Sequence, residues 1–207
     1  MAANLRKVKD ADTEETLTGR AALLWNVTDA VTAVKGALGP HDGIVAALGT
    51  GSVFARQRGG TLTQIGGYGL ALGDEGSGAW LGRALLSATL RALDGFTPMT
   101  PLLAQILQDH GSAEAIVAFS LSARPADFAT LAPRILSSTD PAAVAVVAQA
   151  TADIAASIAL LQPDSPLPVT FLGGLGPAFA ARLPHLDHRP ALGTALDGAL
   201  LLARQAA

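Results

Sequence analysis

A chain of 207 residues is long enough to bury a sizeable core, and its length suggests one or two domains. Hydrophobic residues make up 50% of it and charged residues 15%, which excludes a disordered chain. A net charge of −3 without a basic cluster argues against nucleic acid or an anionic membrane as a partner, and the lack of cysteine excludes disulfides and cysteine-held metal clusters.

Residues 1–20 are polar, mixed in charge and without an apolar period. They do not have the pattern of a signal peptide, and we expect them to be mobile or to form a weak helix. No apolar run approaches the roughly 20 residues that a membrane-spanning helix needs. These features together predict a cytoplasmic protein.

Residues 21–27 are expected to form a short strand that leads directly into a helix. Thr28 and Asp29 begin that helix, apolar residues recur along 30–38 with helical spacing, and Gly39 with Pro40 ends it. A strand that ends near an aspartate before a helix is typical of the switch at which α/β proteins bind their ligands.

Residues 44–77 are central to the prediction, because they indicate a small sheet that carries two glycine-rich loops. The β-branched run 44–48 suits a buried strand, 53–57 and 61–65 predict two more, and Gly59-Gly60 predicts the hairpin between these two. The first glycine loop consists of Gly49, Thr50, Gly51 and Ser52. The second, residues 66–73, surrounds Tyr68 and leads into Asp74, Glu75, Gly76 and Ser77.

The second half of the chain is predicted to be mainly helical. A helix over 79–93 precedes short helical pieces in 96–138, and Asp140-Pro141 predicts the start of a long helix that runs to about Leu161. A fourth strand at 167–172 enters the third glycine loop, residues 173–176, and two helices follow, from about Ala178 and over 192–204.

Three strands as a meander, followed by helix, strand and helix, predict an α/β fold with a mixed sheet. This is the order of a ribonuclease-H-like lobe, and the short helical pieces form an insertion around residues 97–138.

Four segments together resemble the N-acetylglucosamine kinase branch of the BadF/BadG/BcrA/BcrD-type ATPases, within the actin-like, sugar-kinase and Hsp70 superfamily. They are Asn-Val-Thr-Asp-Ala at 26–30, Gly-Thr-Gly-Ser at 49–52, the stretch 66–77 that ends in Gly-Asp-Glu-Gly-Ser, and Phe-Leu-Gly-Gly-Leu-Gly at 171–176. The first glycine loop alone is weak evidence, whereas the composite motif behind it is specific.

The resemblance implies a two-lobed kinase that binds ATP with Mg²⁺ and a sugar in the cleft between its lobes. The first glycine loop would be the second phosphate loop of that family, because successive backbone N–H groups can form an anion-binding nest. Its alternative is an ordinary turn between strands. The resemblance also implies that the adenosine site is formed by Gly173, Gly174 and Gly176.

Asp29 matches the catalytic aspartate of the family. Phosphoryl transfer needs little covalent help, so its role would be to orient the sugar hydroxyl and to accept its proton late in the reaction. The alternative is that Asp29 caps the helix that follows it, since aspartate is a favoured N-cap residue.

The resemblance further implies a sugar site that includes Thr50, Gly67, Tyr68, Asp74 and Glu75. Ionised carboxylates accept hydrogen bonds from sugar hydroxyls, although an acidic pair before a helix is also favoured by the helix dipole. Tyr68 departs from the tryptophan that is common in this branch, which leaves the identity of the amino sugar open.

The largest departure is the lack of the Asp-Gly-Gly-Gly-Thr-type first phosphate loop with which the family begins. Residues 1–40 would be a remnant of the N-terminal lobe and residues 41–207 the C-terminal lobe. The start, Met1 to Leu5, resembles the interior of a family chain, so we expect a truncated product, a cloned segment or a misplaced start. Such a chain would lack part of the machinery for efficient ATP turnover.

The function predicted from this resemblance is transfer of the γ-phosphoryl group of ATP to a hydroxyl, expected at carbon 6, of N-acetylglucosamine, glucosamine or a related hexose. One alternative is a non-catalytic domain that binds nucleotide and sugar. Another is the ATPase activator of a CoA-ester reductase or dehydratase, but that branch holds an iron–sulfur cluster by cysteines, which this chain lacks. A homodimer is expected, as is common in the family.

Overall fold

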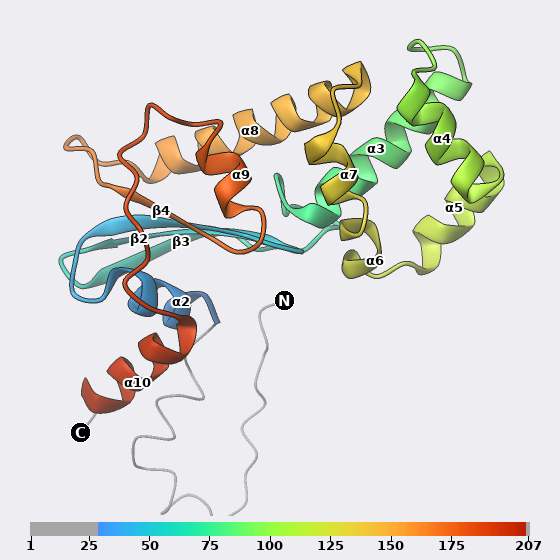
Figure 1. The fold of residues 1–207 in the computed structure, drawn as a ribbon. Coiled ribbons are helices and arrows are strands. Elements are labelled where there is room, and N and C mark those ends of the chain that lie inside the picture. Colours follow the sequence, from blue (N-terminus) through green and yellow to red (C-terminus); the bar gives the residue numbers. More distant parts are fainter. Residues whose placement is uncertain (1–28, 206–207) are drawn as a thin grey trace, which may run out of the picture.

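The computed structural model describes residues 29–205 (Figure 1). The predicted strand at 21–27 and the first part of the Asn-Val-Thr-Asp-Ala motif lie outside the described residues. Four strands form the sheet: β1 (Gly43–Leu48), β2 (Ser52–Arg58), β3 (Thr61–Gly66) and β4 (Val169–Leu172). Each matches a strand predicted from the sequence to within one or two residues at either end.

The strand order is β3-β2-β1-β4. The three sequential strands pair antiparallel, whereas β4 pairs parallel to β1, so the sheet is mixed as predicted. The hairpin between β2 and β3 turns at Gly59 and Gly60, which have φ angles of 54° and 79°. Two consecutive left-handed residues are what a two-residue hairpin of type I′ requires, and glycine adopts them without strain.

Helices cover both faces of the sheet (Figure 1). On one side lie α2 (Asp29–Leu38) and α10 (Ala195–Gln205), and on the other lie α8 (Pro141–Leu161) and α9 (Gly176–Ala180). Strand β1 alternates between the two layers: Ile44 and Ala46 belong to the larger core, and Val45 packs with Val34 of α2. This alternation follows from the period of two in a strand.

The helical insertion extends to one side of the sheet and packs along α3 (Gly78–Leu93) (Figure 1). It contains α4 (Pro101–His110), α5 (Ala113–Ser122), α6 (Pro125–Ala129) and α7 (Ala132–Ser137). Prolines stand at the beginning of three of these helices, and Gly111 ends α4 with a φ of 91°. The expected division of this region into short helices is confirmed.

Helix α8 overturns the expectation that no apolar segment reaches the length of a membrane span. Among the described residues it is the one helix long and apolar enough for a span by length and composition, with 21 residues. Gln149 and Asp153 interrupt its apolar run without reducing its average hydropathy enough to fail that test. The same helix buries Ile154 and Ile158 in the larger core, as a helix that covers a sheet does.

Helix α10 begins at Ala195, three residues later than predicted. The reason lies in Thr194, whose hydroxyl accepts the N–H of Asp197 while the Asp197 carboxylate accepts the Thr194 N–H at 2.7 Å. This reciprocal pair is a capping box, which starts the helix after Thr194 and leaves Leu192 and Gly193 outside it.

Candidate nucleotide and sugar site

The first and third glycine loops lie side by side, because they follow two strands that are parallel neighbours, β1 and β4. The Leu175 N–H donates to the carbonyl of Leu48, the last residue of β1, at 3.0 Å. Gly173 has a φ of 81°, and a Cβ at this position would lie 2.3 Å from the same carbonyl oxygen. Ligands of open α/β sheets bind at this carboxyl edge, so the sheet topology itself brings two of the predicted loops to a binding position.

The carbonyl groups of the first glycine loop face the beginning of α3. The Gly78 N–H donates to the Gly49 carbonyl at 2.8 Å, and the Ala79 N–H donates to the Thr50 carbonyl at 3.1 Å. By contrast, the N–H groups of Thr50 and Gly51 donate to no acceptor within residues 29–205. Two adjacent free N–H groups in a glycine-rich turn can receive an anion such as a phosphate group.

The Gly-Asp-Glu-Gly-Ser segment, residues 73–77, contacts the first glycine loop. The Ser52 hydroxyl donates to the Glu75 carbonyl at 2.9 Å. Ser77, which is fully buried, caps α3 by accepting the Trp80 N–H on its hydroxyl at 3.1 Å. The segment therefore connects the phosphate-binding candidate to the start of a long, buried helix.

The second glycine loop is held by two side chains that point toward it. Asp74 is 7% exposed, and its Oδ1 accepts the N–H of Gly69 at 3.2 Å. Arg83 of α3 donates a hydrogen bond from Nη1 to the carbonyl of Leu70. Tyr68, in contrast, is 74% exposed and stands on the rim of the loop, and Glu75 is exposed as well.

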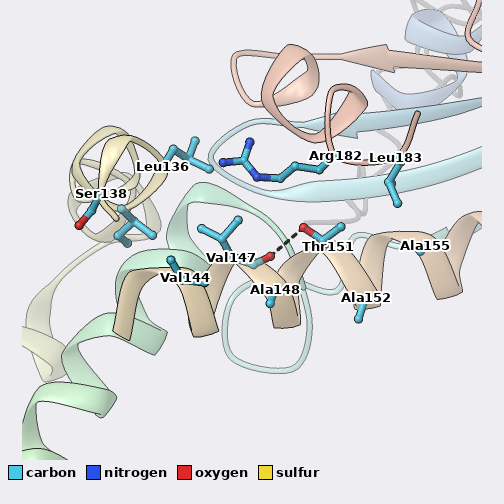
Figure 2. Close-up of a pocket in the computed structure, with 11 residues that line it drawn as sticks. Leu136, Ser138, Val144, Val147, Ala148, Thr151, Ala152, Ala155, Arg182 and Leu183 are labelled. Carbon is cyan, nitrogen blue, oxygen red and sulfur yellow. Dashed lines mark hydrogen bonds between the residues drawn. The ribbon is translucent and has the colours of Figure 1, made fainter. Parts of the chain in front are cut away.

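A groove of about 510 Å³ lies between α7, α8 and the segment after α9 (Figure 2). Its floor is the apolar face of α8, including Val147 and Ala152, and the Arg182 side chain extends across it toward Leu136 (Figure 2). The Arg182 guanidinium donates to the carbonyl of Ala178 at 2.7 Å, which fixes it against α9. Apolar walls with one cation suit a flat aromatic ligand.

The structure thus brings together three of the predicted loops, and Gly174, at the start of the segment that leads to the groove, has open space where a Cβ would stand. Gly176 is buried against the backbone of Phe171. Asp29 is the first residue of α2, at the edge of the described chain, and its assigned role depends on the motif alone.

Three residues of the site were not predicted from the sequence. Ser77 carried a usable signal, since a serine three residues before Trp80 at a helix start is an N-cap pattern. Arg83 and Arg182 gave no such signal in the sequence. Each donates a hydrogen bond to a backbone carbonyl whose position depends on the packing of α3 and α9.

Comparison with known proteins finds one matching family and several relatives. The model of the BadF/BadG/BcrA/BcrD ATPase family matches residues 7–178. Glucosamine kinase GspK of Vibrio cholerae is 36% identical over 132 residues, which cover 61% of this chain and 45% of that protein. N-acetylmuramic acid/N-acetylglucosamine kinase of Clostridium acetobutylicum is 37% identical over 82 residues, or 39% of this chain and 27% of that protein.

Two solved structures share the fold. A protein of Chromobacterium violaceum described as a candidate N-acetylglucosamine kinase superposes with a TM-score of 0.77 at 39% identity, over 86% of this chain and 65% of that one. A similarly described protein of Porphyromonas gingivalis gives 0.63 at 25% identity, over 84% and 64%. The predicted fold class, an α/β lobe of the actin-like ATPase type, is confirmed.

This chain therefore spans less than half of the length of the two curated relatives and about two thirds of each solved neighbour. The match to the family model nevertheless includes all three glycine loops. The chain belongs to the BadF/BadG/BcrA/BcrD ATPase family.

Proposed function

We propose that this chain forms the nucleotide-binding and sugar-binding part of an ATP-dependent kinase for glucosamine, N-acetylglucosamine or a related hexose. The observation that carries the proposal is the pair of free N–H groups of Thr50 and Gly51, next to the third glycine loop at the carboxyl edge of β1 and β4. Relatives named as glucosamine and N-acetylglucosamine kinases support the choice of substrate class.

The phosphate groups of ATP would bind at residues 49–52, with the Thr50 hydroxyl available beside the free N–H groups. The Ser52 hydroxyl, which donates to the Glu75 carbonyl, would hold the loop in place. The ribose and the base would follow the third glycine loop, where Gly174 leaves open space, toward the groove beyond α9. In the groove the adenine ring would lie on the apolar face of α8 under the guanidinium of Arg182.

The sugar would bind beside the second glycine loop. Tyr68 offers an exposed aromatic face to a pyranose ring, and Glu75 offers an exposed carboxylate to its hydroxyls. Gly67, Thr50 and Asp74 are assigned to this site from the motif. Tyrosine in place of tryptophan provides a smaller platform with one added hydroxyl, which is why the choice among amino sugars stays open.

In the proposed reaction a sugar hydroxyl, at carbon 6, attacks the γ-phosphorus of ATP. The new bond joins that oxygen to phosphorus, the bond to the β-phosphate oxygen breaks, and ADP leaves. The hydroxyl proton passes to the carboxylate of Asp29, which acts as the general base.

Mg²⁺ is the usual companion of ATP in such a transfer. Among residues 29–205, no three His, Cys, Asp or Glu residues gather in a group that could hold a metal ion. We propose that phosphate oxygens of ATP and water molecules supply most ligands of the ion, and none of the roles assigned above involves it.

We further propose that the protein works in the cytoplasm as a homodimer. The relatives are kinases, and the exposed apolar side chains of Leu196 and Leu200 on α10 are compatible with a second subunit. Sedimentation of the purified chain at two concentrations tests the association.

Calorimetric titration with ATP tests the proposal, with Gly49→Ala as the matched variant. Among the described residues a Cβ at Gly49 would meet nothing within 4 Å, so the variant should keep its fold while it adds a methyl group to the loop proposed to bind phosphate. We expect ATP to bind the wild-type chain and its affinity to fall about tenfold or more in the variant. Equal affinities would contradict the assignment.

Titration with glucosamine and N-acetylglucosamine then separates the two remaining functions. Binding of both ATP and an amino sugar, with phosphoryl transfer between them, supports the kinase. Binding without transfer supports a non-catalytic domain, which the length of the matched relatives makes the second candidate.

A further inference from the structure

The side chain of Asp74 lies against both the first and the second glycine loop. Its Oδ1 accepts the N–H of Gly69 in the second loop at 3.2 Å. Its Oδ2 lies 2.9 Å from the point where a Cβ of Gly51, in the first loop, would stand. The carboxyl group is thus wedged between the backbones of the two loops.

The backbone of Asp74 is strained in order to hold this position. Its φ is 62°, and no other non-glycine residue among 29–205 has a positive φ. A left-handed conformation costs an L-residue on the order of 1 kcal/mol, and such strain persists where the surroundings over-determine it. The Asp74 carbonyl accepts the N–H of Ser77 at 3.0 Å, so the start of α3 supplies that constraint.

We propose that Asp74 is a positioning residue that sets the conformation of the first glycine loop, and thereby of the phosphate site, through the side-chain wedge between Gly51 and Gly69. The assignment as a phosphate site rests on the proposed function, whereas the contacts do not. This role is separate from a hydrogen bond between Asp74 and a sugar, because it operates with the sugar absent.

The position of the Asp74 carboxyl group explains why residue 51 is glycine. Gly51 has no positive φ that would require glycine, and the obstacle to a side chain is the Asp74 carboxyl group. Gly49, two residues earlier, has open space at the same position. The pair Gly51 and Asp74 is therefore expected to be energetically coupled, and the pair Gly49 and Asp74 is not.

A double-mutant cycle tests this coupling without any ligand. In Gly51→Ala the new methyl group meets the carboxyl group, so the urea midpoint is expected to fall. Adding Asp74→Gly removes the obstacle and the strained φ together, and the midpoint should return toward that of Asp74→Gly alone. Gly49→Ala with Asp74→Gly serves as the control and should be additive. If the effects of Gly51→Ala and Asp74→Gly are additive, the proposed contact between the Asp74 carboxyl group and position 51 is wrong.

Amide hydrogen exchange followed by NMR tests the positioning itself. In Asp74→Gly, exchange at Gly49 and Ala79, whose N–H groups donate to the carbonyls of Gly51 and Thr50, should rise on the order of tenfold. Exchange at Gly59 in the remote hairpin turn, whose N–H donates to the Asp42 carboxylate, should stay unchanged. Asp74→Asn keeps the size of the side chain and its Oδ1 acceptor, so exchange should stay near the wild-type rate. No rise in the glycine variant, an equal rise at the hairpin, or an asparagine variant that behaves like the glycine variant would each contradict the proposal.

ATP affinity measured without sugar gives the functional readout. Asp74→Gly should bind ATP about tenfold more weakly while its urea midpoint is not lowered, and Asp74→Asn should bind as the wild type does. Unchanged affinity in Asp74→Gly would show that the wedge does not control the phosphate site. If the wild-type chain itself fails to bind ATP, the proposed function fails, and the exchange experiment still decides whether Asp74 positions the loop.

Discussion

Gly173 and Gly174 are neighbours in the sequence but differ in what a side chain would meet. At Gly173 a Cβ would lie 2.3 Å from the Leu48 carbonyl oxygen and the φ is 81°. At Gly174 a Cβ would meet no atom of residues 29–205 within 4 Å. The sequence predicts a glycine loop at this point, but it cannot tell these positions apart. The difference depends on β1, which lies more than a hundred residues earlier in the chain.

We predict that Gly173→Ala lowers the free energy of unfolding by roughly 3 kcal/mol, since it combines backbone strain with a clash against the end of β1. Gly174→Ala should stay within about 0.5 kcal/mol of the wild type. Urea denaturation of both variants measures the difference. Equal losses would mean that the two glycines are structurally equivalent, contrary to the geometry.

Asp140 connects two helices through one carboxyl group. Its Oδ1 accepts the N–H of Ala142 in α8 at 2.9 Å, and its Oδ2 accepts the N–H of Leu102 in α4 at 3.0 Å. Burial acts to raise the pKa of this carboxyl group, but hydrogen bonds from Leu102, Thr100 and Ala142 outweigh it, so the pKa is lowered from 3.8. The sequence predicted the cap on α8 but not the bond to α4.

A lowered pKa in the folded state means that the ionised group stabilises the fold above its unfolded pKa, and that this contribution is lost as the pH falls through the folded pKa. We predict that the wild type loses more free energy of unfolding than Asp140→Asn as the pH falls from about 5 to 2. The reason is that the aspartate becomes protonated in this range, whereas asparagine does not titrate. Asp140→Ala should cost about 1 kcal/mol at neutral pH. Urea denaturation across that range checks both results, and parallel pH profiles for wild type and Asp140→Asn would contradict the assignment.

Helices α2 and α10 cross at two glycines, with their backbones in close approach. A Cβ at Gly198 would lie 2.0 Å from the carbonyl oxygen of Thr32, and one at Gly36 would lie 1.8 Å from that of Thr194. The sequence predicted both helices but not their contact, because isolated glycines within helical patterns do not reveal which helix they face.

We predict that Gly198→Ala displaces α10 from α2 and lowers the free energy of unfolding by about 2 kcal/mol. Limited proteolysis should then cut α10 first. Arg204→Lys, at an exposed side chain of the same helix, is the control and should leave proteolysis unchanged. A Gly198→Ala protein as resistant as the wild type would rule out the tight crossing.

At the scale of the whole molecule, local patterns predicted the element order, the mixed sheet and the presence of three glycine loops. They could not predict which loops touch, because the contacts of Gly173 with Leu48 and of Asp74 with Gly51 are set by tertiary packing. The groove under Arg182 could not be predicted from the sequence either, because it forms where α7, α8 and the segment after α9 meet. The apolar length of α8 was missed because its polar residues are spaced along the helix.

The central claim is that the glycine loops of this chain form one site for ATP and an adjacent amino sugar. NMR titration of the isotope-labelled full chain tests it most directly, because each backbone N–H reports its own surroundings. ATP should shift the signals of Thr50, Gly51 and Gly174 and the side chain of Arg182, and glucosamine or N-acetylglucosamine should shift Gly67 and Tyr68. Both ligands should leave the exposed helix α5 unaffected. Shifts confined to other regions, or none at saturating ligand, would contradict the account.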